Sequence, residues 1–261
     1  MKIFINTDTY KKRAVKTEEE LTQYCRKLDI EIAEDIEESD IVFSIGGDGT
    51  FLKTARLSSK PIIGINTGTV GFLTEINPDD LKSALDDIIN QNYHIENRMM
   101  LEGEIHKADG EIINIPQSLN EIAVSKNMLG VVRFDVFVNG KFITSHTADG
   151  IIVCTPTGST AYNFSCGGPV AEPTAEIITV TPIAPHSIIN RSMILSENSV
   201  IEIKITELRD NTHSFVLYDG IPVEVVSGDS VKIFKSQRKT EIIKMDDSSF
   251  IKTISKKISS Q

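Results

Sequence analysis

The sequence predicts an α/β, Rossmann-like domain over residues 1–98 and an all-β, sandwich-like domain over residues 99–248, followed by a tail over residues 249–261. Two observations support this prediction. Up to about residue 98, continuous apolar runs alternate with helical periodicity, as a βαβ arrangement requires. Beyond that point helical periodicity nearly vanishes, and short alternating runs are separated by turn dipeptides, as in a β-sandwich.

The first domain contains three strand-like and three helix-like segments. The expected strands are Lys2–Ile5, Ile41–Ile45 and Pro61–Ile65, and the expected helices are Thr17–Leu28, Phe51–Leu57 and Pro78–Asn90. We expect Thr17 to cap the first helix, because three glutamates follow it at the positive helix end. The run Ile41–Ile45 is apolar throughout, which is typical of a strand buried on both faces of a parallel sheet.

Dipeptides that favour hairpin turns mark the second domain. They are Asp109-Gly110, Asn139-Gly140 and Asp219-Gly220. The clearest hairpin joins Phe134–Val138 to Lys141–Thr144. The tail has a weak helical spacing over Phe250–Ile258, and it is expected either to pack back on the first domain or to fray.

Composition excludes several classes of protein. The chain has 261 residues, of which 40% are hydrophobic and 25% charged, with a formal net charge of -10. That charge disfavours nucleic acid or an anionic membrane as a partner. No apolar run approaches the ~20 residues that span a bilayer, and the first residues are too weakly apolar for a secretory signal. The three cysteines lack CxxC spacing and predict reduced thiols, so a cytoplasmic protein is expected.

The stretch IVFSIGGDGT at residues 41–50 ends a buried strand in three glycines around Asp48. A strand, a glycine turn and a helix form an arrangement in which main-chain N–H groups receive an anion. Gly46, Gly47 and Gly49 are expected to allow positive φ and to leave room for a ligand. The alternative is a tight structural turn, because Asp-Gly turns are common. The chain has neither a Walker loop nor a GxGxxG fingerprint.

The carboxylate at the centre of this loop suggests that the glycines and the aspartate have different roles. Asp48 cannot itself attract a phosphate. A hydroxyl that attacks a phosphoryl group needs its proton removed or oriented, and a nearby carboxylate does this. The glycines would hold donor phosphates, while Asp48 prepares an acceptor alcohol. The pattern therefore favours a kinase.

Several segments resemble the NAD kinase family. GGDGT at residues 46–50 occurs in a superfamily that contains NAD kinases, phosphofructokinases and diacylglycerol-type lipid kinases. The segments similar to NAD kinases are NTGTVGFL at 66–73, SLNEIAVSK at 118–126, ADG at 148–150 followed by TPTGSTAYNFSCGGP, and TPIAPHS at 181–187. They span most of the chain, in the family's order and at about its spacing.

The resemblance implies an activity and a set of site residues. NAD kinases transfer the γ-phosphoryl of ATP, and in some members of inorganic polyphosphate, to the 2′-hydroxyl of the adenosine ribose of NAD, producing NADP. Asp48 matches the family's proton acceptor. The nucleotide-binding residues implied are Gly46, Gly47, Asp48, Gly49, Lys53, Asn120, Glu121, Asp149, Thr157, Thr160, Ala161, Tyr162, Ser165 and Ala184.

Cofactor and partner expectations accompany this resemblance. Magnesium is expected to arrive with ATP and to retain several waters. No zinc site built from protein ligands is predicted, because the five histidines show no paired spacing. A homodimer or homotetramer is expected, in which a neighbouring subunit completes the NAD site. Val131-Val132 and Phe134–Val138 offer a surface for assembly, although an internal sandwich core is the simpler account of them.

The chemistry of these side chains suits a nucleotide. An amide such as that of Asn120 can hydrogen-bond an adenine edge, and a carboxylate such as that of Glu121 can accept ribose hydroxyls. Small residues around Tyr162 let a main chain approach a flat base, and the tyrosine ring can cover a nucleoside face. Lys53 can reach a phosphate as a point charge.

Each of these residues also has an ordinary structural interpretation. Lys53 fits a solvated helix face, Asn120-Glu121 an exposed turn, Asp149 a common turn and Tyr162 a half-buried core aromatic. His186 suits a structural hydrogen bond at least as well as a site. One departure from the family is Thr147, where some members carry a basic residue, and the adjacent His146 could substitute in part.

Two other functions stay open. A lipid kinase would use the same glycine loop, but the segments around residues 66, 120 and 155 suit a nucleotide acceptor. A non-catalytic sensor of NAD or ATP is a different class. The sequence argues against a sensor only through Asp48, because a sensor needs no base at that position.

Overall fold

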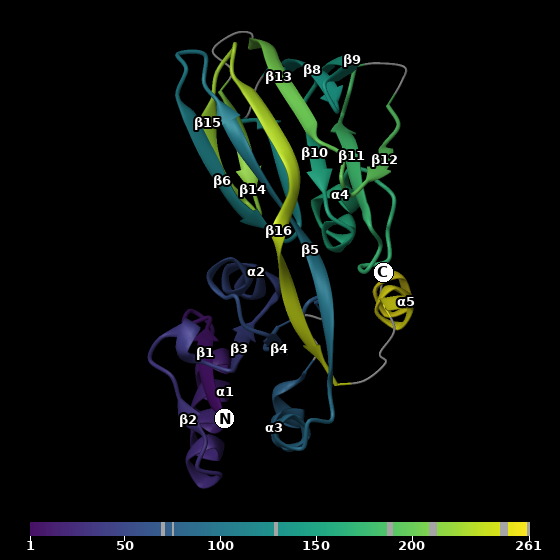
Figure 1. Ribbon diagram of the computed structural model, residues 1–261. Helices are drawn as coiled ribbons and strands as arrows, with labels where there is room; N and C mark the ends of the chain where they lie inside the picture. Colours follow the sequence, from purple (N-terminus) through teal and green to yellow (C-terminus); the bar gives the residue numbers. More distant parts are fainter. Residues whose placement is uncertain are drawn as a thin grey trace. The chain divides into compact units, whose positions relative to one another are not determined.

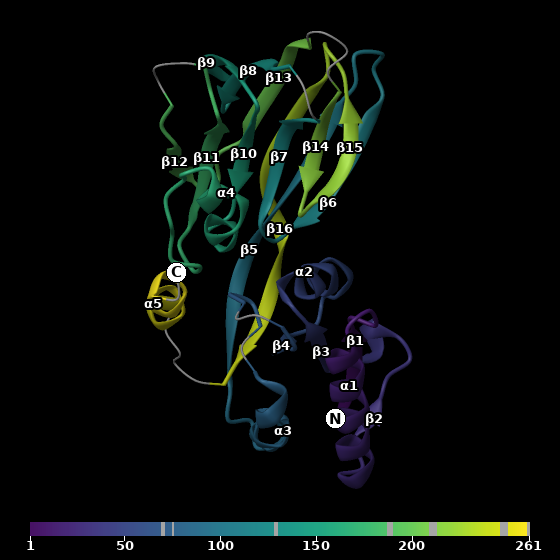
Figure 2. The same cartoon turned by 180° about the vertical axis from the view of Figure 1, so that it is seen from behind.

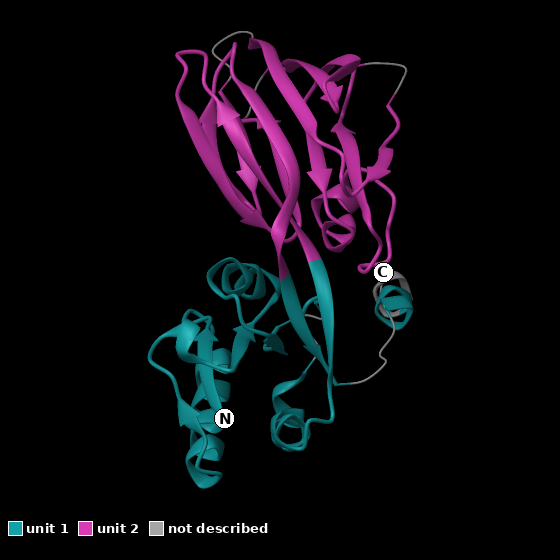
Figure 3. Ribbon diagram, in the orientation of Figure 1, with its two compact units in different colours: residues 1–98, 240–261 teal, residues 99–239 magenta. Residues whose placement is uncertain are grey.

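In a computed structural model the chain forms two compact units, one of residues 1–98 with 240–261 and one of residues 99–239 (Figure 3). The structure describes residues 1–68, 71–74, 76–127, 130–186, 190–208, 213–245 and 250–259. The boundary after Arg98 coincides with the expected one. Residues 240–245, expected in the β domain, instead group with the first unit, because the end of the last strand pairs there.

The first unit is built on a parallel sheet with the strand order β2-β1-β3-β4-β16 (Figure 1). Its strands are β1 (Lys2–Thr7), β2 (Glu31–Ile32), β3 (Ile41–Gly46), β4 (Ile62–Asn66) and the end of β16 (Ser230–Lys244). Every residue of β3 and β4 is buried, as the continuous apolar runs predict. β16 joins the sheet beside β4, where Ile242 pairs with Ile62.

The helices of this unit are α1 (Lys12–Lys27), α2 (Asp48–Leu57), α3 (Leu81–Ile89) and α5 (Phe250–Ser259), with short 3-10 turns at Ile36–Glu38 and Pro78–Asp80. The expected start of α1 at Thr17 is wrong. Thr17 is buried inside the helix, and its hydroxyl donates to the carbonyl of Arg13 at 2.8 Å. The buried stripe of α1 begins one turn earlier at Ala14, so packing on the sheet sets where the helix begins.

The tail forms α5 and groups with the first unit. The ring of Phe250 lies 6.4 Å, centroid to centroid, from that of Phe72, which belongs to the same unit. Among the described residues, no helix is both long and apolar enough to cross a membrane.

The second unit contains two sheets of mainly antiparallel strands. Figure 2 shows the order β12-β11-β10-β7-β14-β15 in one of them. Its strands are β7 (Glu121–Lys126), β10 (Gly150–Cys154), β11 (Ile177–Ile183), β12 (Met193–Ser196), β14 (Ser214–Tyr218) and β15 (Ile221–Val225). The other sheet runs β16-β13-β8-β9, with β5 and β6 added beside β16. Its further strands are β5 (His94–His106), β6 (Ile112–Ser118), β8 (Val132–Val138), β9 (Lys141–Ala148) and β13 (Ile201–Leu208).

The three predicted hairpin turns are confirmed. They join β5 to β6, β8 to β9 and β14 to β15. Their glycines, Gly110, Gly140 and Gly220, have φ of +96°, +75° and +83°, the left-handed conformation that glycine adopts readily.

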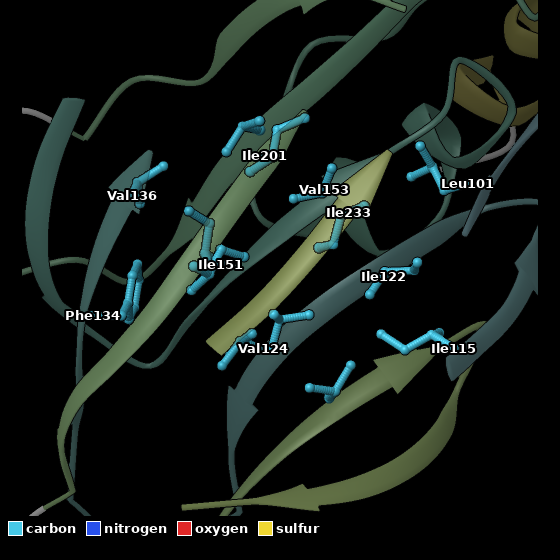
Figure 4. Packing of buried hydrophobic residues seen from close by; sticks show 14 of the residues in the cluster. Leu101, Ile115, Ile122, Val124, Phe134, Val136, Ile151, Val153, Ile201 and Ile233 are labelled. Carbon is cyan, nitrogen blue, oxygen red and sulfur yellow. The ribbon is translucent and has the colours of Figure 1, made fainter. Parts of the chain in front are cut away.

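An apolar core fills the space between the two sheets of the second unit (Figure 4). Ile122 and Val124 of β7 and Ile151 and Val153 of β10 contribute to it from one sheet. From the other sheet, β8 contributes Val132, Phe134 and Val136, all fully buried. The internal-core account of β8 is therefore correct, and these three side chains offer no surface for assembly.

Candidate functional site

The carboxylate of Asp48, the first residue of α2, is held by a neighbouring loop of the same unit. Its Oδ2 accepts the N–H of Phe72 at 2.9 Å, and its Oδ1 accepts the N–H of Leu73 at 3.1 Å and the hydroxyl of Thr74 at 3.4 Å. A Cβ at Gly71 would lie 2.0 Å from Oδ1, so only glycine fits there. These contacts use three of the ~four lone pairs of a carboxylate and leave room to accept one further hydroxyl.

The glycines on either side of Asp48 differ in how much space a side chain would have at their positions. A Cβ at Gly46 would lie 2.2 Å from Oγ1 of Thr50, whereas one at Gly47 would meet only Nζ of Lys11, at 3.6 Å, and one at Gly49 nothing within 4 Å. The expected positive φ is wrong at all three, because the chain passes directly into a helix and Gly47 has φ −120°. Gly46 is required by packing, while Gly47 and Gly49 leave open surface.

A pocket of about 430 Å³ lies at this N-terminus of α2. It is lined by Gly47, Gly49, Thr50, Lys53 and Arg56, and by residues 6–11, which form the end of β1 and the segment after it. Lys11, Lys53 and Arg56 bring positive charge to it, and Asp8 pairs with Lys11 at 3.2 Å. A helix N-terminus together with basic side chains favours an anionic ligand. Lys53 is exposed on α2 and lines this pocket, so a phosphate contact and a solvated helix face both stay open for it.

Lys11 and Arg56 are members of this pocket that the sequence analysis missed. Arg56 lies three residues after Lys53 on α2, hence on the same helical face. That spacing is a signal that the sequence does contain. Lys11 follows the first strand, and only the parallel pairing of β1 with β3 brings it to the glycine loop.

In the second unit, Asn120 and Glu121 lie at the start of β7 and are bound to Asp219. The Asp219 carboxylate accepts the N–H groups of Leu119, Asn120 and Glu121 at 2.8, 2.9 and 3.3 Å. Asn120 and Glu121 are only 8% and 9% exposed, so the exposed-turn interpretation is wrong. Asp219 was noticed in the sequence only as part of a hairpin turn.

The environment of Glu121 favours its neutral form. Burial raises the pKa of Glu121 to about 8, and the negative charge of Asp219 adds to the rise. Its Oε2 is buried, with no hydrogen-bond partner among the described residues. At neutral pH the side chain is therefore mostly a carboxylic acid, which can donate one hydrogen bond. This differs from the expected carboxylate that only accepts.

The segment after β10 packs directly on Asn120. The hydroxyl of Thr155 donates to the carbonyl of Leu119 at 2.6 Å, and the Thr155 N–H donates to the carbonyl of Asn120 at 2.9 Å. A Cβ at Gly158 would lie 2.1 Å from that same Asn120 oxygen. The 3-10 turn η3 (Thr157–Thr160) and the short helix α4 (Tyr162–Ser165) follow. The turn that contains Gly158 is thus packed against Asn120.

Tyr162 and its neighbours lie at the surface of this region. Tyr162 is 38% exposed and Ser165 is exposed, whereas Thr160 and Ala161 are half-buried. The pKa of Tyr162 is raised by partial burial and by Cys166 beside it. The tyrosine ring is therefore not a core residue.

Asp149 and Ala184 lie close together, before β10 and after β11, and the charge of Asp149 acts on Tyr162. The Asp149 N–H donates to the carbonyl of Ile183 at 3.0 Å, and Ala184, exposed and at φ 42°, follows Ile183. Oδ1 of Asp149 pairs with Nζ of Lys126 at 2.7 Å. Lys126 was missed, because only the antiparallel pairing of β7 with β10 brings it there.

His146 does not replace the missing basic residue. Its ring is buried and lies 5.6 Å from the ring of Phe134, centroid to centroid, and burial lowers the pKa of His146. It is a neutral core residue at neutral pH. The side chain of His186 is exposed. The main-chain N–H of His186 donates to the carbonyl of Thr147 at 2.8 Å. Thr69, Val70 and Ser187, from the segments that resemble NAD kinases, lie outside the described residues.

Two other observations bear on the chemistry. The hydroxyl of Ser159 donates to the carbonyl of Ala171 at 3.3 Å and accepts the Ala171 N–H at 3.0 Å, so Ser159 has a structural role. Across the described parts of the chain, no three His, Cys, Asp or Glu side chains gather closely enough to hold a metal ion. Cys25, Cys154 and Cys166 are free thiols.

Comparison with known families matches both halves of the chain. Residues 4–93 match the family model of the ATP-NAD kinase N-terminal domain, and residues 119–245 match that of the ATP-NAD kinase C-terminal domain. The NAD kinase of Caldanaerobacter subterraneus subsp. tengcongensis is 40% identical over 225 residues, which cover 84% of this chain and 78% of that protein. The NAD kinase of Lachnospira eligens is 36% identical over 236 residues, 84% of this chain and 80% of that protein.

Solved structures of similar fold agree. An NAD kinase from Archaeoglobus fulgidus in complex with ATP aligns with a TM-score of 0.79 and 28% identity, over 100% of this chain and 98% of that one. Yeast NADH kinase complexed with NADH aligns with a TM-score of 0.90, over 99% of this chain and 87% of that one. At 23% identity the yeast enzyme supports the fold alone. With both domains matched and relatives above 30% identity covering most of it, the chain belongs to the NAD kinase family of phosphotransferases.

Proposed function

We propose that this protein transfers the γ-phosphoryl group of ATP to the 2′-hydroxyl of the adenosine ribose of NAD, producing NADP and ADP. The observation that carries the proposal is the carboxylate of Asp48. It is fixed by the N–H groups of Phe72 and Leu73 at the N-terminus of α2, and its neighbours Gly47 and Gly49 line the basic pocket. A general base beside a phosphate-binding site is what phosphoryl transfer to an alcohol needs.

In the proposed reaction, the pocket at α2 holds the donor phosphates. Main-chain N–H groups at the helix start and the cations of Lys11, Lys53 and Arg56 oppose the charge of the phosphates. Asp48 accepts the proton of the 2′-hydroxyl as the ribose oxygen bonds to the γ-phosphorus. The bond from that phosphorus to the β–γ bridging oxygen breaks, and ADP leaves. Magnesium belongs to the substrate MgATP, where it neutralises phosphate charge and retains waters.

The second unit supplies the proposed binding surface for NAD. Asn120 offers an amide for the adenine edge, and Glu121 offers a buried acid beside it. Main-chain atoms near Gly158 and the exposed ring of Tyr162 suit a flat base. Asp149, paired with Lys126 and near enough to Tyr162 for its charge to act there, would also contact the nucleotide, as would Ala184.

We further propose a cytoplasmic homo-oligomer, either dimer or tetramer. The sheets of the second unit have edge strands β9 and β12, and both expose apolar side chains: Phe142 and Ile143 on β9 and Ile194 on β12. Edge strands with exposed apolar side chains are surfaces that another subunit can cover. This assignment replaces the expected surface on β8, whose apolar side chains lie in the core.

A coupled assay for NADP tests the activity. The purified protein is given NAD with MgATP, with magnesium and inorganic polyphosphate, or with MgATP and a diacylglycerol in place of NAD. We expect NADP from NAD and MgATP, and polyphosphate tests the second donor. Binding of NAD and ATP without turnover would identify a sensor instead, and phosphorylation of the lipid would identify a lipid kinase.

Phosphorus NMR of the product tests the position of transfer. A single resonance of a ribose 2′-phosphate is expected, because base and donor pocket sit on one rigid element and align only one hydroxyl for attack. A 3′-phosphate, or a mixture of the two, would contradict the proposal.

A further inference from the structure

The turn between β14 and β15 carries an aspartate with an unusual set of contacts. Asp219 adopts φ 44°, and its carboxylate accepts three consecutive N–H groups, those of Leu119, Asn120 and Glu121. Its own N–H donates to the carbonyl of Glu121 at 3.1 Å. Asp219 thus both accepts hydrogen bonds from the main chain at the start of β7 and donates one to it. Hydrogen bonds to a charged acceptor are each worth more than neutral ones, so this arrangement is a strong constraint.

The constraint acts on the two side chains that the proposed function assigns to the nucleotide. Asn120 is also held from the other side, since its carbonyl accepts the N–H of Thr155 at 2.9 Å and contacts Gly158 closely. The main chain of Glu121 is also held by β10, where it pairs with Cys154, but the side-chain atom Oε2 has no partner among the described residues. The position of the Glu121 side chain therefore depends on the main chain that Asp219 and β10 hold.

The charged and titratable groups around Glu121 come from three elements. Asp219, on the β14–β15 turn, brings a negative charge that opposes ionisation of Glu121. Cys154 is the residue of β10 that pairs with Glu121, and Cys166 follows α4. The pKa of each thiol is raised, first by burial, so both are neutral at neutral pH. Tyr218 of β14 pairs with Ile122 and packs in the apolar core, on the opposite face of the sheet.

We propose that Asp219 is a positioning residue of the nucleotide site: it fixes Asn120 and Glu121 at the start of β7, where the buried Glu121 carboxyl, whose Oε2 has no partner among the described residues, donates a hydrogen bond to bound NAD. The inference rests on the proposed function for the identity of the ligand. To that function it adds Asp219, a residue that does not touch the substrate, and the protonation state of Glu121, a residue that does. Burial of Glu121 and the charge of Asp219 act in the same direction, since both disfavour the carboxylate.

The pH dependence of NAD binding tests the protonation state. Calorimetry with NAD alone, between about pH 6 and pH 9.5, avoids any contribution from ATP. We expect the affinity of the wild type to fall above pH 8, where Glu121 ionises. Glu121→Gln keeps a donor and an acceptor but does not titrate, so its affinity should stay level through this range. A wild-type affinity that is level over the same range overturns the proposal.

Asp219→Asn tests the positioning. The amide cannot accept all three N–H groups, and removing the negative charge lowers the pKa of Glu121. We expect roughly a tenfold loss of NAD affinity, about 1.4 kcal/mol, with the alkaline fall moved to lower pH. In turnover, the KM for NAD should rise while the KM for ATP stays near the wild-type value. Unchanged NAD affinity and an unchanged pH profile in a folded Asp219→Asn protein overturn the proposal.

A second buried aspartate in the same unit provides the matched control. Asp229 also accepts main-chain N–H groups, those of Ala108 and Val226, and it touches none of the site residues. Asp229→Asn should destabilise the protein to a similar degree yet leave the NAD affinity and its alkaline fall unchanged. If Asp229→Asn shifts both in the same way, the effect of Asp219 is only structural, and the proposal fails.

Carbon-13 NMR of glutamate carboxyls gives a readout that needs neither turnover nor a folded Asp219 variant. The Glu121 resonance is assigned by its loss in Glu121→Gln. Its titration near pH 8 in the wild type supports the proposal, and titration below about pH 6 overturns it. Binding and titration are measured without ATP. A protein that meets these expectations but makes no NADP would therefore contradict the proposed function and leave this inference standing.

Discussion

A single carboxylate at the start of α2 is oriented by two main-chain donors, with the hydroxyl of Thr74 as a third, longer contact. Asp48 accepts N–H groups from Phe72 and Leu73, and Gly71 leaves the space in which its Oδ1 lies. Main-chain donors cannot rotate away, so the geometry of the proposed base survives side-chain motion. This makes substitutions at Asp48 and at its glycine neighbours informative, because their structural and chemical effects can be separated.

Asp48→Asn should lower turnover by roughly 10²–10⁴, the range for loss of a positioned general base. The amide is nearly isosteric but can accept only one of the two N–H groups well, so the free energy of unfolding should fall by only about 1 kcal/mol. Steady-state kinetics, NAD calorimetry and urea unfolding measure the three quantities. Asp86→Asn, at an exposed position of α3, is the control. Turnover near the wild-type rate would remove Asp48 from the mechanism.

Gly49→Ala separates a structural turn from a phosphate site. A Cβ at Gly49 meets nothing within 4 Å, and Gly49 lies in a helix, where alanine is favoured over glycine by about 0.5 kcal/mol or more. We expect a small gain in stability together with roughly a tenfold rise in the KM for ATP, because the methyl group fills space that a phosphate would occupy. Ser83→Ala on α3 is the control. A stabilised variant with an unchanged KM for ATP would favour the structural turn.

Local patterns indicate candidate site residues, but they do not indicate what surrounds those residues in the folded chain. The glycine loop, Asn120-Glu121 and the Tyr162 segment stand out as short motifs. Asp219 lies about 100 residues away from the N–H groups that it binds, and nothing in its own Asp-Gly turn indicates that contact. The neutral acid at Glu121 was missed for the same reason, because burial is a property of the folded chain.

At the scale of elements, two turns of the second unit are joined by one buried aspartate. Asp229, before β16, accepts the N–H groups of Val226 and Ala108, each at 2.9 Å, and pairs with Nζ of Lys107 at 2.6 Å. Ala108 and Lys107 belong to the β5–β6 turn, so this carboxylate connects that turn to the one between β15 and β16. Its side chain is fully buried.

Asp229→Asn should lower the free energy of unfolding at pH 7 by about 2–4 kcal/mol, because it leaves Lys107 without its buried partner. Burial alone would raise the pKa of Asp229, but the hydrogen bonds from Lys107, Val226 and Ala108 lower it. A lowered pKa contributes stability that is complete above the ordinary value of 3.8 and is lost as the pH falls through the folded value. Urea unfolding should therefore show the difference between wild type and variant shrinking below that pH.

The control for this prediction is Asp109→Asn in the same turn. Asp109 is exposed and accepts one N–H, from Glu111 at 3.1 Å. Its replacement should change stability by less than about 0.5 kcal/mol. A wild-type-like Asp229→Asn protein, or a difference that grows at low pH, would contradict the assigned role of Asp229.

Element boundaries show where sequence reasoning succeeds and fails. Strands β3 and β4 were predicted because strands buried on both faces are apolar throughout, and the hairpins because Asn-Gly and Asp-Gly favour their turn type. The start of α1 was missed because Ala14 and Thr17 are weakly apolar, and only packing on the sheet shows that they are buried. The pairing of β16 with β4 joins residues 180 positions apart, which no local pattern indicates.

For the whole molecule, the proposed oligomer leads to a dilution test. If a neighbouring subunit completes the NAD site, specific activity should fall as the protein is diluted through the subunit dissociation constant. NAD should oppose that fall, because ligand binding and assembly are linked. Phe142, 57% exposed on the edge strand β9, is a position at which a charge should promote dissociation, so Phe142→Lys should lose activity at higher protein concentration than the wild type.

Sedimentation velocity measures the assembly directly. Ser145→Lys, on the same strand but outside the apolar pair Phe142-Ile143, provides the control for added charge. A monomer with full activity and full affinity for NAD would refute the shared site and leave the kinase assignment unaffected.

The last strand of the first unit comes from the far end of the chain, and this sets the order in which a nascent chain can fold. Residues 1–98 leave the ribosome first, yet the edge of β4 that pairs with Ile242 stays uncovered until β16 emerges. Domains usually fold in the order of their synthesis, the N-terminal one first. Here residues 99–239 can form their unit while the N-terminal sheet still exposes an unpaired strand edge, the feature that templates aggregation. The unit that is synthesised first is therefore the one that is exposed to aggregation until synthesis of the chain is nearly finished.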